Sequence, residues 1–308
     1  MKIMIEEIPG IEHYLSILKK ERKPKYLEAK EDNTLTKKIE EVENILKSCI
    51  LCERKCNVDR TSNQLGFCKC DTKARIFGSF AHYGEEPELI PSATLFFAGC
   101  TMRCCYCQNA PESIEPKLGI IWDEKEIAEW IEKMEFNGCK NVNFVGGDPT
   151  PYLYNILKAL SFCKASLPVI WNSNSYYSKF TAEVLKGIVD LYLLDFRYFN
   201  NKCAIKFSNA PNYVETAKRN LIEAKNDASL IIRILVIPSH IECCTKPILK
   251  WIADNLGCET RINIMDQYWP AFQAYKYKEI SRKLKPKEYL EVLEYAEDLG
   301  LNNRVLDL

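Results

Sequence analysis

From residue 94 onward, short apolar runs alternate along the chain with longer segments whose apolar residues recur at helical spacing. Apolar runs that are rich in β-branched and aromatic side chains predict buried strands. We expect strands at TLFFAG (94–99), NVNFVG (141–146), PVIWN (168–172), VDLYLLD (189–195), LIIRILVIP (230–238) and RINIMD (261–266), with NRVLD (303–307) as a further candidate.

Amphipathic helices are predicted between these strands. One covers Glu124–Phe136, which Asp123 and Glu126 open as a capping box and Asn137–Gly138 closes. Others begin near Tyr152, Thr181, Tyr213, Thr245 and Lys287. Strand–helix alternation implies a parallel sheet with right-handed crossovers, so the predicted fold class is α/β, a partial (β/α) barrel of about six parallel strands. Ligands of such sheets bind at the carboxyl ends of the strands.

The first 92 residues have a different character. Residues 1 to about 48 are charged and periodic, which indicates amphipathic helix, and we interpret them as a solvated lead-in. Residues 49–92 hold cysteines, glycines and turn formers with little periodicity, as expected of a segment organised by a metal or by packing on a neighbour. We therefore predict a helical leader and cysteine-rich N-terminal module over 1–92 and a barrel over 93–308.

Charge and hydropathy narrow the class of protein. Lysine plus arginine (42) equal aspartate plus glutamate (42), which gives no support to nucleic-acid binding or to an anionic membrane surface. The first residues lack a signal-peptide core, and no run reaches the roughly 18 apolar residues of a membrane span. We expect a cytoplasmic protein. Its fifteen cysteines then favour metal binding or catalysis over a disulfide framework.

Three cysteines follow the first predicted strand closely. In GCTMRCCYCQN, Cys100, Cys104 and Cys107 have C-x3-C-x2-C spacing. Three thiolates on one loop can bind three corners of a cubane iron–sulfur cluster, whereas a structural zinc ion needs a fourth ligand. Cys105 is off this spacing and is expected to be a packed thiol. A cysteine-rich turn or a structural metal site is the alternative interpretation.

This loop, with Tyr106 before its last cysteine, resembles the cluster loop of radical S-adenosylmethionine (SAM) enzymes. The resemblance implies a 4Fe-4S cluster on Cys100, Cys104 and Cys107, whose open iron binds SAM and cleaves it to a 5′-deoxyadenosyl radical for hydrogen abstraction. It also implies an electron donor such as a ferredoxin or flavodoxin.

From Cys49 onward, segments such as VGGDPTP, WNSNSYYS and NIMDQYWP resemble PflX-type proteins, relatives of the pyruvate formate-lyase activating enzyme. That kinship implies a glycyl radical enzyme as a candidate partner. The substrate stays open between such a partner protein and a small metabolite or nucleotide, and the catalytic residues stay open as well.

Polar residues at two further strand ends are candidates for SAM binding. Gly146, Gly147 and Asp148 precede a proline, and this segment resembles the family's Gly-Gly-Glu-Pro segment, which implies that Asp148 binds the SAM amino group. Adjacent glycines let backbone approach a ligand closely, although they also occur in ordinary turns. Asn172 and Asn174 suit ribose hydroxyls and the methionyl carboxylate, or belong to a polar loop with a helix cap.

Charged residues mark the next two strand ends. The family likeness implies that Asp195 contacts SAM or the reacting centre, whereas the plain alternative is a surface ion pair with Arg197. Arg233 lies inside an apolar strand and needs an anionic partner, either the SAM carboxylate or an internal carboxylate.

Three other segments near strand ends are left open by the sequence. A lone histidine such as His240 is more often structural than catalytic. Cys243 and Cys244 lie close to it in the sequence, which favours a loop that borders the active site. Residues 265–270 either line a pocket or plug the barrel mouth. Residues 82–87, with one histidine and two glutamates, supply acid–base groups or a docking loop.

The N-terminal module holds Cys49, Cys52, Cys56, Cys68 and Cys70. Four of these thiols can bind zinc or a second iron–sulfur cluster, or all five are reduced and packed. The alternative to an enzyme is a non-catalytic iron–sulfur or zinc protein for electron transfer or binding. That class accounts for the cysteines but not for the polar strand ends at 146–150 and 172–175.

Overall fold

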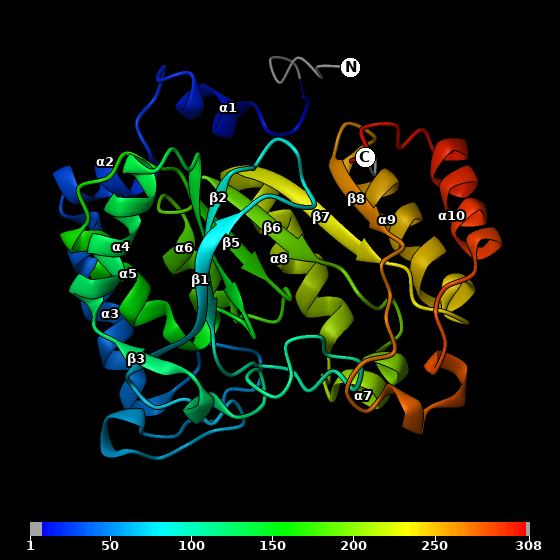
Figure 1. Cartoon of the computed structure of the whole chain (residues 1–308), viewed down its shortest axis with the longest axis horizontal. Helices are drawn as coiled ribbons and strands as arrows, with labels where there is room; N and C mark the ends of the chain where they lie inside the picture. Colours follow the sequence, from blue (N-terminus) through cyan, green and yellow to red (C-terminus); the bar gives the residue numbers. More distant parts are fainter. Residues whose placement is uncertain (1–7, 306–308) are drawn as a thin grey trace.

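The computed structural model describes residues 8–305 and contains one eight-stranded sheet in the order β3-β1-β2-β4-β5-β6-β7-β8 (Figure 1). Six of these strands form consecutive parallel pairs. They are β2 (Ser92–Phe97), β4 (Asn141–Gly146), β5 (Val169–Ser173), β6 (Leu191–Asp195), β7 (Ser229–Leu235) and β8 (Arg261–Met265). The sheet is not closed, because β3 and β8 are its two edges. The prediction of a partial barrel of about six parallel strands is confirmed.

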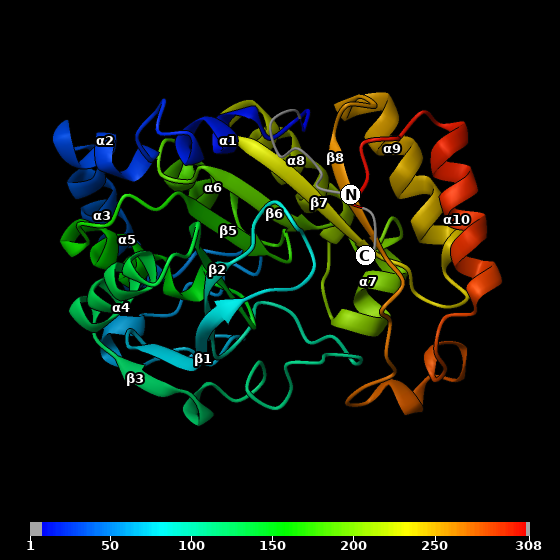
Figure 2. The same cartoon turned by 45° about the horizontal axis from the view of Figure 1, so that its top comes forward.

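Helices connect the strands and cover the outer face of the curved sheet (Figure 2). They are α4 (Glu124–Phe136), α5 (Leu153–Phe162), α6 (Lys179–Leu185), α7 (Asn201–Ser208), α8 (Tyr213–Asp227), α9 (Lys246–Leu256) and α10 (Pro286–Asp298). The capping box at the start of α4 is confirmed, since the Asp123 carboxylate accepts from two backbone N–H groups and the Glu126 side chain accepts from Asp123 N. Helix α7 was not predicted.

Two strands from outside the predicted set extend the sheet. β1 (Ala74–His82) runs antiparallel to β2, and β3 (Ile120–Trp122) runs antiparallel to β1. Their burial patterns explain why sequence reasoning missed them, because most of β1 is only partly buried and two of the three residues of β3 are exposed. The cysteine-rich segment is therefore packed on a neighbour, since its own strand pairs with β2.

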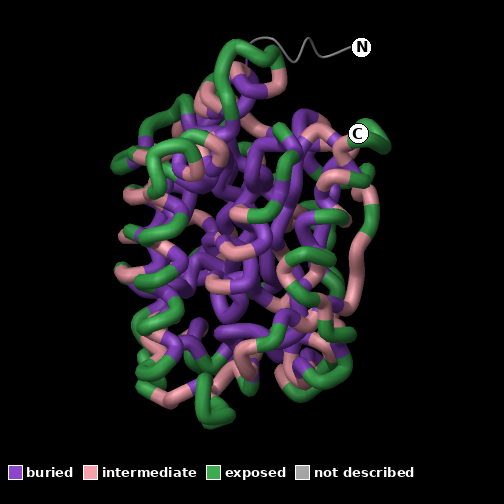
Figure 3. The backbone as a smooth tube through the Cα atoms, turned by 90° about the vertical axis from the view of Figure 1, so that its left-hand side faces the viewer, coloured by how far each residue is buried: buried purple, intermediate pink, exposed green. Residues whose placement is uncertain are grey.

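The N-terminal helices are α1 (Glu12–Leu18), α2 (Lys25–Glu31) and α3 (Thr34–Ile45). Tyr14 and Leu15 of α1 are buried in a cluster with Ile170, Leu193 and Ile231 from three parallel strands. Apolar residues of α2 and α3 belong to the main core, which Figure 3 shows as a continuous buried interior. The interpretation as a solvated lead-in is wrong, because the apolar stripe of these helices is part of the core.

A hydrogen bond fixes which end of the barrel α1 covers. Asn141 Nδ2, at the start of β4, donates to Tyr14 Oη over 2.8 Å. Asp190, just before β6, accepts from Lys25 N at 3.0 Å. The leader thus covers the amino ends of the strands and leaves their carboxyl ends for a ligand.

Within residues 303–305, the candidate last strand is only a single bridge between Ile262 and Arg304, and residues 306 and 307 lie outside the described residues. No helix among residues 8–305 is long and apolar enough to cross a bilayer.

Candidate active site

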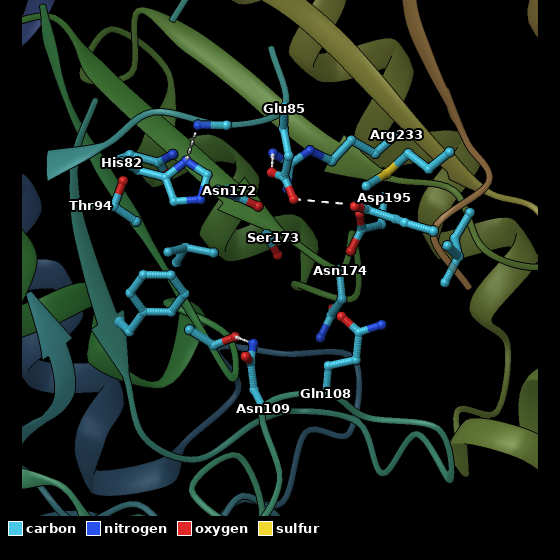
Figure 4. A pocket seen from close by; sticks show the side chains of 18 of the residues that line it. His82, Glu85, Thr94, Gln108, Asn109, Asn172, Ser173, Asn174, Asp195 and Arg233 are labelled. Carbon is cyan, nitrogen blue, oxygen red and sulfur yellow. Dashed lines mark hydrogen bonds and ion pairs between the residues drawn. The ribbon is translucent and has the colours of Figure 1, made fainter. Parts of the chain in front are cut away.

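A cavity of about 260 Å³ lies at the carboxyl ends of the parallel strands (Figure 4). We call it the strand-end cavity. Its polar lining comes from successive strands and from the loops that follow them. Among these residues are Thr94, Asn143, Gly146, Gly147, Asn172, Ser173, Asn174, Asp195 and Arg233. Its volume is close to the roughly 300–1,000 Å³ that is usual for small-molecule sites.

The three-cysteine loop forms one wall of this cavity through Cys107. Hydrogen-bond donors surround the sulfur atoms of the loop. Arg197 Nη1 and Ser208 Oγ each donate to Cys104 Sγ over 3.1 Å, and Asn174 Nδ2 lies 3.5 Å from Cys100 Sγ. Such donors stabilise sulfur in its anionic, metal-binding form.

Burial raises the pKa of the Cys100 thiol well above its usual value and also raises that of Cys107. A bound metal cation would therefore favour the loss of their protons. One zinc ion at about 2.3 Å from each sulfur would hold any two of them within about 4.6 Å, whereas a cubane spreads its ligands over separate irons. Among the described residues, these three cysteines do not form a group with all ligand atoms within 4.8 Å of one another. The loop fits an iron–sulfur cluster better than a single zinc ion.

Gly146 and Gly147 line the cavity, but their backbone approaches another strand end. A Cβ on Gly146 would lie 2.2 Å from Phe97 N, and one on Gly147 would lie 2.0 Å from Gly99 O. Gly147 N donates to Phe97 O over 2.7 Å. The glycines therefore let β4 and its loop pack directly against the strand that leads into the three-cysteine loop, where sequence reasoning had expected a close approach to a ligand.

Asp148 is buried and is not among the residues that line the cavity. Its carboxylate accepts from Thr150 N at 2.9 Å, from Ser173 Oγ at 2.9 Å and from Asn174 N at 3.1 Å. The contacts seen for Asp148 are thus internal to the protein and hold the end of β5 in place. Asn172 and Asn174, in contrast, line the cavity.

The anionic partner of Arg233 is internal. Its guanidinium forms two hydrogen bonds with Glu86, at 2.8 and 2.7 Å, and also binds Glu85. Burial opposes the ionisation of Glu86, but the neighbouring Arg233 lowers the pKa of this carboxyl overall. Segment 82–87 therefore closes one side of the cavity, with Glu86 held as an anion rather than as a proton donor.

Asp195 and Arg197 form an ion pair at the cavity and not on the open surface. Arg197 Nε and Nη2 lie 3.1 and 2.5 Å from Asp195 Oδ2, while the third nitrogen reaches Cys104. The pair thus connects the end of β6 to the three-cysteine loop.

The sequence left open whether residues 265–270 line a pocket or plug the barrel mouth. Cavity lining is confirmed for Met265, Gln267, Tyr268 and Trp269.

Sequence reasoning missed Asn143. This residue lies in the interior of β4, and its Oδ1 is buried without a hydrogen-bond partner in the part of the chain that the structure describes. Buried polar atoms are normally paired, so an unpaired acceptor on the cavity wall fits a ligand N–H or O–H group. The available signal was an asparagine at an alternating position of an otherwise apolar strand.

Comparison with known proteins decides the family. The model of the radical SAM superfamily matches residues 94–252, which include the three-cysteine loop and the ends of β4 to β7. The chain belongs to the radical SAM superfamily. This family uses a 4Fe-4S cluster to cleave SAM, and the residues around the strand-end cavity fit both groups.

This radical SAM protein is 42% identical to an uncharacterized protein of Methanocaldococcus jannaschii, over 90% of this chain and 82% of the relative. It is 29% identical to the pyruvate formate-lyase-activating enzyme of Staphylococcus epidermidis, over 47% of this chain and 61% of that enzyme. A crystal structure of Streptococcus suis SuiB bound to precursor peptide SuiA superposes with a TM-score of 0.50 at 17% identity. The match covers 65% of this chain and 43% of SuiB, and it supports the fold alone.

The N-terminal cysteines of this radical SAM protein lie around a buried arginine, Arg60, whose Nε has no partner among the described residues. A hydrogen bond from Cys70, helped by Arg60, lowers the pKa of Cys68 to about 6. The five thiols do not form a group within 4.8 Å in the described structure, so their arrangement is not that of a single-ion site. All fifteen cysteines are free of disulfides.

Proposed function

We propose that this radical SAM enzyme holds its 4Fe-4S cluster on Cys100, Cys104 and Cys107 and binds SAM in the strand-end cavity. The observation that carries the proposal is that Cys107 and the polar strand ends line the same cavity. When bound, the two cofactors supply a 5′-deoxyadenosyl radical that abstracts a hydrogen atom from the substrate. A ferredoxin or flavodoxin is the proposed electron donor.

The protein's own side chains have three tasks in this proposal. Arg197 and Ser208 donate to Cys104 and stabilise it as a thiolate. Asn172, Asn174 and the unpaired Oδ1 of Asn143 bind polar groups of SAM. We assign the same task to Gly146, Gly147 and Asp195 on the cavity wall. Asp148 and Arg233 act indirectly. Asp148 holds Ser173 and Asn174 in place, and Arg233 holds Glu86.

We propose a PflX-type role in which the substrate is a glycyl radical enzyme. Support comes from the 29% identity to an activating enzyme over 47% of this chain. Trp269 and Tyr83 are 52% and 70% exposed beside residues that line this cavity. Exposed aromatic residues of this kind suit contact with a protein surface.

The test is anaerobic incubation of the reconstituted protein with reductant, SAM and glycyl radical enzymes of the source organism. The expected result is a glycyl radical signal by electron paramagnetic resonance, with one 5′-deoxyadenosine formed per radical. Cleavage of SAM without any such signal, but with hydrogen abstraction from a small molecule of the cell extract, would contradict the protein substrate and keep the radical chemistry.

For the N-terminal cysteines we propose a second iron–sulfur cluster rather than zinc. The positive charge of Arg60, Arg54 and Arg103 near these thiols supports it, because positive charge suits an anionic cluster. Iron well above the four atoms of one cluster, lost in part in Cys49→Ser or Cys68→Ser, is expected. Zinc in place of this extra iron would contradict it.

A further inference from the structure

A second group of metal-binding side chains lies outside the strand-end cavity. Cys203 belongs to α7, whereas His240 and Cys243 lie between β7 and α9. Their ligand atoms all lie within 4.8 Å of one another, which no other such group does among residues 8–305. None of the three lines the cavity.

The ring of His240 is prepared for a metal by its hydrogen bond. Nδ1 lies 2.9 Å from the backbone oxygen of Pro238. Because a carbonyl oxygen only accepts, Nδ1 carries a proton, and in the neutral ring Nε2 keeps a lone pair. A histidine that ligates through one nitrogen and donates to a carbonyl through the other is the usual arrangement of metal sites. The side chain is also buried, so water does not satisfy it as it would a surface histidine.

A further thiol lies next to this group, although it is outside the set whose ligand atoms are all within 4.8 Å of one another. Cys244 is buried, and its Sγ lies 3.9 Å from Cys243 Sγ. Two thiolates on one tetrahedral zinc ion are about 3.8 Å apart when each Zn–S distance is about 2.3 Å. The local backbone supports this arrangement, because Ile241–Thr245 forms a single π-helical turn, a feature that is often found at functional sites.

We propose that Cys203, His240 and Cys243 bind one zinc ion, with Cys244 as the nearest further thiol for the fourth position. Three thiolates and one imidazole are a ligand set of structural zinc. None of these four residues lines the strand-end cavity, so the ion has no role in the chemistry there. The proposal does not depend on the identity of the enzyme's substrate.

The position of the proposed zinc site indicates a structural role in supporting the three-cysteine loop. Helix α7 supports the three-cysteine loop, since Phe207 O accepts from Cys105 N over 2.7 Å and Ser208 Oγ donates to Cys104 Sγ over 3.1 Å. The Phe207 ring also packs edge-on against His240, with the ring centroids 4.8 Å apart. A zinc ion bound here joins α7 to the end of β7 and so fixes the helix on which the loop rests.

The test is the zinc and iron content of the holoprotein, purified anaerobically without a chelating resin. We expect about one zinc ion per chain in the wild type and in Cys258→Ser, a control at an exposed cysteine. Zinc should be lost in Cys203→Ser and in Cys243→Ser, and it should be retained in His240→Cys, which replaces one ligand by another. The iron of the three-cysteine loop should stay bound in all soluble variants.

A second measurement uses only the wild-type protein, so it tests the proposal even if the variants fail to fold. In the wild-type holoprotein, mass spectrometry after alkylation should show Cys203 and Cys243 protected until a zinc chelator is added, while Cys258 reacts at once. The proposal is overturned if zinc is absent from wild type, if its loss follows Cys49→Ser instead, or if Cys203 and Cys243 are alkylated at once. A Cys203–Cys243 disulfide in anaerobically purified protein would overturn it as well.

Discussion

Side chains at the strand-end cavity are held by neighbouring residues before any ligand binds. Arg197 is fixed by Asp195 and aimed at Cys104, and Arg233 is fixed by Glu86. Residue types at strand ends and the local pair of Asp195 and Arg197 were therefore predictable from the sequence, but the long-range partners were not, because Cys104 and Glu86 come from distant parts of the chain. Asp148 has both kinds of partner, since Thr150 follows it closely whereas Ser173 and Asn174 lie at the end of β5 and just after it.

Replacing Asp148 by alanine should weaken SAM binding about tenfold or more, although the structure shows its carboxylate bound to protein. The substitution leaves three buried donors without an acceptor, and each such group costs roughly 1–3 kcal/mol. We expect a lower Tm together with the weaker binding, measured by calorimetry on cluster-loaded protein. The conservative variant Asp148→Asn should recover part of both. Wild-type SAM affinity in a loaded Asp148→Ala variant would contradict this account.

Cys105 should behave differently from its neighbours. Burial raises the pKa of its thiol to about 12, so it stays protonated at neutral pH. The variant Cys105→Ser should keep its iron and most of its SAM cleavage, as measured by iron analysis and product chromatography. Loss of the cluster in this variant alone would mean that the ligands are wrongly assigned.

At the scale of elements, the strong periodic signals were predictive and the weak ones were not. The six parallel strands and α4 follow from apolar runs and a capping box, whereas β1 and β3 are half-exposed strands that depend on long-range pairing, β1 with β2 and β3 with β1. The leader was misread because a solvated helix and a helix that packs on a sheet have the same apolar stripe. The division of the chain at residue 92 stays a prediction, and β1 and β2 on either side of it share one sheet.

The packing of α1 under the barrel predicts a large effect of Leu15→Ala. Leu15 is 5% exposed among strand side chains, so its truncation should lower the free energy of unfolding by roughly 2–5 kcal/mol. Leu65→Ala, at a side chain that is 47% exposed, is the matched control and should change it little. Equal effects of both in urea denaturation would show that α1 is not part of the core.

Because the backbone after β4 contacts the chain just before the three-cysteine loop, we predict that Gly147→Ala strongly lowers both the stability of the protein and its iron content. The added Cβ would lie 2.0 Å from Gly99 O, so the loop must move. Gly138→Ala is the control, because its Cβ meets nothing within 4 Å and only its positive φ is unfavourable, at about 1 kcal/mol. We expect Gly147→Ala to lose iron and stability together. A fully loaded Gly147→Ala variant would contradict the close approach.

At the scale of the whole molecule, three arrangements together leave the carboxyl ends of the parallel strands as the site. The leader closes the amino ends of the strands, the parallel order directs polar side chains to the carboxyl ends, and the three-cysteine loop borders the same cavity. The fold class and this edge could be predicted from strand–helix alternation alone. The bonds between the loop and α7 could not, because they join residues that are far apart in the chain, such as Cys104 and Ser208.

The central claim is that Cys100, Cys104 and Cys107 hold the cluster that cleaves SAM in the strand-end cavity. The most direct measurement is electron paramagnetic resonance of the reduced, anaerobically reconstituted protein with and without SAM, combined with the yield of 5′-deoxyadenosine. The account predicts a 4Fe-4S signal that SAM perturbs, with 5′-deoxyadenosine formed by wild type and by Cys105→Ser but not by Cys100→Ala, Cys104→Ala or Cys107→Ala. A SAM-perturbed signal and wild-type product yield in any of these three alanine variants would contradict it.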